Sequence, residues 1–147
     1  MKTTIYILFL LALCNICFSQ NFSGRWQTQT SEISDAYLGN YLFSKSTFEY
    51  TINGYDGLNS IQALGGNYYT HSDTIYFTVT YIKQSVGGTL ERSEIYTQND
   101  SWAFEGATIK TVNLTPTVHT VATFKLQDNV LWIDERKFCK LNTENEK

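Results

Sequence analysis

The chain has 147 residues, a net charge of −3 at pH 7 and aromatic side chains at 15% of its positions. A chain of this length can bury a substantial hydrophobic core and form one domain. Its acidic and basic residues are scattered and form no basic stripe, which argues against nucleic acid or an anionic membrane surface as a partner.

The N-terminal segment has the composition of a secretory signal peptide. Lys2 precedes an apolar run over 5–13, and the small residue Ser19 fits a cleavage site. The run is too short for a membrane span, and large residues precede both cysteines of the segment, where a lipoprotein signal needs a small one. We therefore expect residues 1–19 to be removed and residues 20–147 to form one secreted or periplasmic domain, with lipid anchoring as the less favoured alternative.

Alternating apolar and polar residues predict β-strands through most of the remaining chain. The first strand is expected around Trp26, and the segment 31–39 is compatible with one short helix. A further strand is expected over 47–52, and the turn-forming residues 53–57 end it.

In the middle of the chain, paired glycines and polar turns interrupt the alternation. Gly65 and Gly66 predict a bend or bulge in one strand, and 71–73 predicts a turn after it. The strand over 74–81 combines β-branched and aromatic residues, which suit a half-buried pleated surface. One face of that strand is expected to carry Ile75, Phe77, Val79 and Tyr81.

The second half of the chain continues this pattern of short strands and turns. Strands are expected over 89–98, 101–111, 118–126 and 130–141, and turns at 86–88, 99–100 and 127–129.

About eight short strands joined by short turns predict an all-β fold. An antiparallel sheet of this kind must protect its two edges, and closure into an up-and-down barrel removes them. A β-sandwich is the alternative. An eight-stranded barrel has an interior that side chains can fill or that can hold one small ligand.

Parts of the sequence resemble a known family. They are the Gly24-Arg25-Trp26 start, the hairpin over 66–78 and the closing stretch 131–137. Together with the meander of strands, they resemble the bacterial lipocalin-like (calycin-type) family of small exported barrels. The resemblance implies a barrel whose tryptophan packs across the closed base, with a late arginine stacked on it.

The resemblance also implies structural roles in barrel closure for particular residues. Trp26 matches the tryptophan of the family, Arg136 is the arginine expected to stack on it, and Gly24 lets the first strand turn sharply. A guanidinium over an indole face contributes about 0.5–2 kcal/mol.

Aromatic side chains are more numerous than a core of this size requires, and several are expected to line a cavity. Ligand pockets combine apolar walls with a few polar groups, and tyrosine supplies both. The candidate lining residues are Tyr50, Tyr68, Phe77, Tyr81, Glu94, Tyr96, Trp102 and Phe104, with Phe48 and Phe124 beside them. The expected function is the binding of a small apolar or aromatic ligand. The alternative is a protein-interaction or inhibitor module with a barrel that side chains fill.

The sequence contains no catalytic signature and no metal-binding motif. Neither His71 nor His119 has the spacing of a hydrolytic triad or of a zinc site. Glu94 is the carboxylate expected to face inward, where burial can tune a carboxyl as an acid or base, but no partner accompanies it. We therefore expect a protein that is not an enzyme and has no cofactor, and an isomerase or hydrolase using Glu94 ranks last.

Overall fold

The computed structural model describes residues 22–28, 38–52, 57–92 and 102–141. Every regular element in these ranges is a strand, and none of the described residues forms a helix long and apolar enough to cross a membrane. The strands are β1 (Gly24–Thr28), β2 (Asn40–Phe43), β3 (Thr47–Thr51), β4 (Ile61–His71), β5 (Thr74–Val86), β6 (Thr89–Arg92), β7 (Trp102–Glu105), β8 (Thr108–Gln127), β9 (Val130–Ile133) and β10 (Arg136–Lys140). The segment 31–37, where a helix was considered, and the turn at 99–100 lie outside the described residues.

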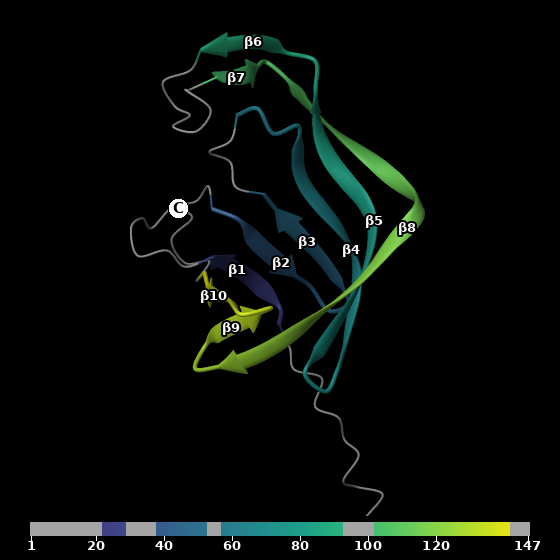
Figure 1. Cartoon of the computed structure of the whole chain (residues 1–147), viewed down its shortest axis with the longest axis vertical. Coiled ribbons are helices and arrows are strands. Elements are labelled where there is room, and N and C mark those ends of the chain that lie inside the picture. Colours follow the sequence, from purple (N-terminus) through teal and green to yellow (C-terminus); the bar gives the residue numbers. More distant parts are fainter. Residues whose placement is uncertain (1–21, 29–37, 53–56, 93–101, 142–147) are drawn as a thin grey trace, which may run out of the picture.

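Eight of these strands form a closed antiparallel barrel. Its wall follows the order β1, β2, β3, β4, β5, β8, β9 and β10, and β10 pairs with β1 to close it (Figure 1). The predicted up-and-down barrel is therefore confirmed, and the β-sandwich alternative is wrong. β6 and β7 form a separate two-stranded sheet at the end of an arm built by the long strands β5 and β8 (Figure 1).

The last predicted strand, over 130–141, is in fact two strands joined by the turn Asp134-Glu135. Ile133 pairs with Arg136 across this turn, and Asp134 and Glu135 have φ angles of 44° and 68°. Left-handed residues in a tight turn match the twist of a hairpin, but their usual sequence signal is Asn or Gly. Because Asp134-Glu135 lacks that signal, the turn could not be read from the sequence.

The bend predicted at the paired glycines is a β-bulge between β4 and β5. Gly66 pairs with Val79 and Gly65 pairs with Tyr81, so Thr80 has no pairing partner in β4. One extra residue reverses the face that each following side chain occupies. Tyr81 therefore lies on the outer face of the barrel, and the expectation that it shares a face with Val79 is wrong.

β8 bends opposite this bulge. Val118 pairs with Val79, but the next paired residue of β8 is Asn113, so residues 114–117 have no partner in β5. Pro116 lies in this unpaired stretch, where its missing N–H costs no ladder hydrogen bond. Beyond the bend, β8 continues with β5 into the arm (Figure 1).

The barrel interior is packed mainly with aromatic rings. Phe22 and Trp26 are almost wholly buried, and Nε1 of Trp26 donates a hydrogen bond to the carbonyl oxygen of Phe22 at 2.7 Å. The ring of Phe22 also lies 5.6 Å from that of Phe43 and 4.8 Å from that of Phe124. The buried core consists of Phe22, Trp26, Phe43, Phe48, Ile75, Phe77, Val79, Ala122, Leu131, Ile133 and Phe138. Phe22 is therefore a central core residue to which the sequence had given no role.

Candidate functional site

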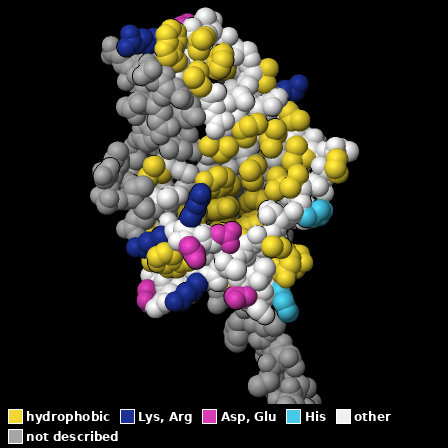
Figure 2. Space-filling model, in the orientation of Figure 1, with side chains coloured by type: hydrophobic (Ala, Val, Ile, Leu, Met, Phe, Trp, Pro, Cys, Tyr) yellow, Lys and Arg dark blue, Asp and Glu magenta, His cyan; other side chains and the backbone are white. Residues whose placement is uncertain are grey.

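A cavity of about 620 Å³, partly open to solvent, is lined by residues of β2, β3, β4, β5, β8, β9 and β10 and of the turn between β9 and β10. Its lining residues are Tyr41, Phe48, Tyr50, Leu64, Phe77, Val79, Val118, Thr120, Ile133, Asp134, Arg136 and Phe138. Figure 2 shows hydrophobic side chains gathered in a hollow on this face of the molecule, with charged side chains along its lower edge. The site therefore has an apolar body and a few charged groups.

Aromatic rings form the wall between the cavity and the packed core. The ring of Tyr41 lies 4.6 Å from that of Tyr50, 6.1 Å from that of Phe77 and 5.2 Å from that of Phe138. Phe48 packs on Phe77 with 4.7 Å between ring centroids. Rings that contact several neighbours have little freedom to move, so packing within the barrel holds this wall in place without a ligand.

A few polar groups interrupt these apolar walls. Tyr41, Tyr50 and Thr120 contribute hydroxyl groups, while Asp134 and Arg136 contribute one negative and one positive charge. Ligand sites in proteins combine apolar surface with a small number of polar groups that set orientation. The arrangement can therefore bury the apolar part of a molecule and hold its polar part in one place.

The hydroxyl of Tyr41 is kept neutral by its surroundings. Burial raises the pKa of Tyr41, and Tyr50 and Asp134 add to this effect while Arg136 opposes it, so that the pKa moves from 10.0 to about 12. A phenol whose pKa is raised by folding stabilises the folded protein in its protonated form. This contribution to the free energy of unfolding is fully present below the unfolded pKa of 10.0 and is lost as the pH rises to about 12.

We expect the wild-type protein to lose free energy of unfolding across this alkaline window, and the Tyr41→Phe variant to lose less, because it has no phenol to ionise there. Urea unfolding on both sides of the window measures the two losses. Equal losses in the two proteins would contradict the assignment of Tyr41 as a buried neutral phenol.

Some of the residues predicted to line the cavity do line it, and others lie elsewhere in the fold. Tyr50 and Phe77 line the cavity together with Phe48. Tyr68 packs against the core instead, and its hydroxyl donates to the carbonyl oxygen of Ser44 at 2.9 Å. Tyr68 therefore supports the barrel wall and lies outside the cavity lining.

Trp102 and Phe104 lie far from the barrel interior, because β7 belongs to the arm. Phe104 pairs with Leu90 of β6, and all of these apolar side chains are exposed (Figure 2, upper end). The expectation that Trp102 and Phe104 line the cavity is wrong, since alternation shows which residues share a face but not which sheet a strand joins. Glu94 and Tyr96 lie outside the described residues.

The cation over Trp26 is not the expected one. Nζ of Lys140 lies 5.5 Å from the centroid of the Trp26 ring, and the two residues pair directly between β1 and β10. Arg136 lines the cavity instead, so its assignment to barrel closure beside Trp26 is wrong. Gly24 has a φ angle of 121°, a backbone conformation that residues with a side chain rarely adopt, so the position favours glycine.

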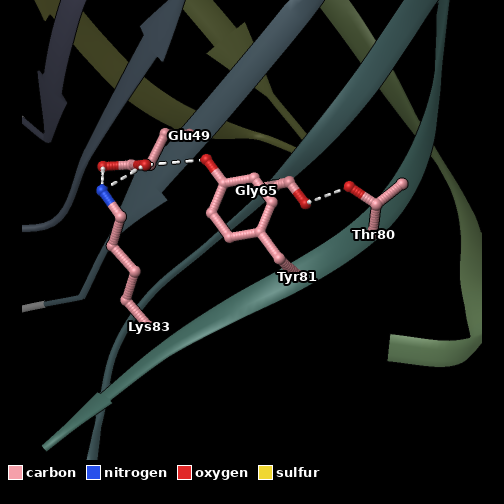
Figure 3. A network of polar contacts seen from close by, with 5 residues as sticks. All are labelled: Glu49, Gly65, Thr80, Tyr81 and Lys83. Carbon is pink, nitrogen blue, oxygen red and sulfur yellow. Dashed lines mark hydrogen bonds and ion pairs between the residues drawn. The ribbon is translucent and has the colours of Figure 1, made fainter. Parts of the chain in front are cut away.

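Glu49 belongs to a polar network on the outer face of the barrel. Its carboxylate accepts hydrogen bonds from the hydroxyl of Tyr81 at 2.7 Å and from Nζ of Lys83 at 2.8 Å (Figure 3). Tyr81 crosses Gly65 to reach it, and a Cβ on Gly65 would collide with the phenol. Partial burial acts to raise the pKa of Glu49, but these hydrogen bonds outweigh it and hold the pKa below its ordinary value. Glu49 is therefore an ionised link between β3 and β5.

Metal ligands do not gather in the part of the chain that the structure describes. It contains no group of three or more His, Cys, Asp or Glu side chains able to hold a metal ion. The ring nitrogens of His119 lie 3.2 Å and 3.3 Å from the hydroxyl oxygens of Thr78 and Thr117. Glu91 and Glu105 are exposed on the arm.

The fold and the site together define a closed β-barrel with an aromatic-walled cavity that carries two opposite charges. Comparison of the chain with protein-family models, curated proteins and solved structures finds no match. The function must therefore be argued from the cavity and its chemistry.

Proposed function

We propose that the protein is an exported, lipocalin-like, non-catalytic carrier that binds one small apolar or aromatic molecule inside its barrel. The observation that carries this proposal is the aromatic-walled cavity of about 620 Å³. Small-molecule sites have volumes of roughly 300–1,000 Å³, mostly apolar walls and a few polar groups, and this cavity has each of these properties. The signal-like sequence of residues 1–19 supports export.

Native mass spectrometry of the protein purified from its own host tests this proposal. We expect a species that carries one small molecule, which is released when the protein is denatured. A spectrum without bound molecules, together with a crystal structure of the same preparation in which side chains fill the interior, would overturn the proposal.

Val118→Trp is expected to block the cavity. Val118 lines it, yet the side chain is 52% exposed, so an indole can occupy the cavity without displacing the packed core. We expect the affinity for a neutral apolar probe, N-phenyl-1-naphthylamine, to fall about tenfold or more. A tenfold loss corresponds to about 1.4 kcal/mol of binding free energy. Probe fluorescence measures the affinity.

Val121→Trp is the matched control for this variant. Val121 lies on the same strand and is 59% exposed, but it is absent from the cavity lining and pairs with Tyr76 on the outer face. Its replacement should leave probe affinity unchanged. Equal affinities for the two variants would show that the probe binds elsewhere.

A second candidate function is recognition of a partner protein through the arm. Leu90, Trp102 and Phe104 share one face of the sheet formed by β6 and β7, and all are exposed. Exposed apolar clusters of this kind often mark interaction surfaces. A protein that co-purifies with the wild type from its host, and that is lost from the Trp102→Ser, Phe104→Ser double variant, would favour this function over transport.

A further inference from the structure

We propose that the molecule held in the cavity is an amphipathic anion, whose acidic group pairs with Arg136 while its apolar body lies against the aromatic wall. This inference rests on the proposed carrier function and adds the charge of the ligand to it. The shared chemistry is one carboxylate, sulfonate or similar oxyanion group on an aromatic or aliphatic body.

Arg136 is the cation in the cavity lining, and its side chain has no partner in the described part of the chain. Among the described residues, the lining contains no Lys or other Arg, and Arg136, whose side chain is exposed at the cavity, forms no ion pair or side-chain hydrogen bond. A guanidinium is charged throughout the physiological pH range and offers a planar fork of donors that matches an oxyanion. Arg136 can therefore give its donors to a bound ligand without breaking a contact of the fold.

Asp134 carries the one negative charge in the described lining, and its carboxylate already accepts hydrogen bonds from Thr123. Oδ1 of Asp134 accepts hydrogen bonds from the backbone N–H of Thr123 at 2.9 Å and from its hydroxyl at 3.2 Å. The backbone N–H of Asp134 also donates to the carbonyl oxygen of Thr123 at 3.1 Å. The carboxylate is thus tied to β8 and needs no cationic ligand to satisfy it.

The rest of the lining also suits an anion with an apolar body. The hydroxyls of Tyr41 and Tyr50 lie in the same cavity as Arg136 and can donate hydrogen bonds to an oxyanion. Burial raises the pKa of Tyr41 to about 12, which keeps its hydroxyl proton available as a donor. Thr120 and Asp134 are the other polar residues of the described lining, and its remaining residues are aromatic or aliphatic, so most of the wall can cover the apolar body of the ligand.

Two fluorescent probes with the same ring skeleton test this inference directly. The anionic probe is 8-anilino-1-naphthalenesulfonate, and the neutral probe is N-phenyl-1-naphthylamine, which lacks the sulfonate. The full net charge of the chain is −3, so non-specific electrostatics favours the neutral probe. We expect the wild type to bind the anionic probe about tenfold or more tightly than the neutral one, in line with a charge-assisted hydrogen bond.

Arg136→Gln is expected to remove this preference. The affinity for the anionic probe should fall about tenfold or more, while the affinity for the neutral probe should stay unchanged and report an intact cavity. Arg136→Lys keeps the charge but loses the fork, and it should show an intermediate loss. Lys137→Gln removes the same charge from the neighbouring residue of β10, which is outside the cavity lining, and should behave as the wild type.

The outcomes separate this inference from the carrier function. If both probes bind with equal affinity and Val118→Trp weakens both, the cavity binds ligands but the inference about charge is wrong. If Arg136→Gln and Lys137→Gln weaken the anionic probe equally, its preference reflects the overall charge, and the inference is again wrong. If neither probe binds, or if Val118→Trp changes neither affinity, the carrier function itself is contradicted together with the inference.

Discussion

Trp26→Ala is expected to lower the free energy of unfolding by about 3–5 kcal/mol, the usual cost of truncating a buried large aromatic residue. The Trp26 side chain is only 2% exposed and belongs to the buried core. Its removal leaves a cavity beside Phe22, whose carbonyl oxygen loses the hydrogen bond from Nε1, and it also removes the ring beneath Lys140. Urea denaturation followed by circular dichroism measures the loss.

Trp132→Ala is the control for this prediction. Trp132 lies on β9 and is 38% exposed, so its removal creates no enclosed cavity and should cost less than half as much. An unchanged denaturation midpoint in the Trp26→Ala variant would contradict the structural role assigned to Trp26. Trp26→Phe, which keeps most of the packing but loses the hydrogen-bond donor, should fall between the wild type and Trp26→Ala.

Gly66→Ala is expected to destabilise the barrel by about 3 kcal/mol, at the upper end of the usual cost of overpacking. A Cβ at this position would collide with the carbonyl oxygen of Thr78 and would lie 2.9 Å from the backbone nitrogen of Thr80. Both are main-chain atoms of β5 at the bulge, so they cannot move aside without disturbing the pairing of β4 with β5. Thermal and urea unfolding measure the effect.

Asn67→Ala provides the comparison for the glycine substitution. Asn67 is the next residue of β4, is exposed and pairs regularly with Thr78, so its replacement should change stability by no more than about 0.5 kcal/mol. If Gly66→Ala is tolerated as well as Asn67→Ala, the close approach of the strands at the bulge is not a requirement of the fold.

The class of fold could be predicted from the sequence because it depends on repeated local signals. Alternation along 74–81 and the glycine pair at Gly65 and Gly66 are properties of neighbouring residues, and each predicted a feature that the structure contains. The bulge was predicted, but its effect on side-chain direction was not followed past Thr80. For that reason Phe77 was placed correctly at the cavity, whereas Tyr81 was placed on the wrong face.

The candidate site was harder to predict because it depends on which strands meet. Tyr41 lies on a strand that the sequence analysis did not assign, although the alternation of Tyr41 and Phe43 could have revealed it. Arg136 was noticed, but its place depends on the turn Asp134-Glu135, which carries no Gly or Asn signal. Trp102 and Phe104 have the composition of a cavity wall, and only the three-dimensional pairing assigns them to the arm.

The bend of β8 also affects whether the edge of this strand can pair with a strand of a second chain. Residues 108–113 of β8 pair with β5 on one side, and no strand of the described ranges pairs with them on the other. Open edges invite pairing with a second chain unless a charge, a proline or an irregularity disrupts the ladder. Lys110 lies on this edge, and the unpaired stretch with Pro116 ends it. We therefore expect the irregularity that carries the arm away from the barrel also to disfavour pairing of this edge with a second chain.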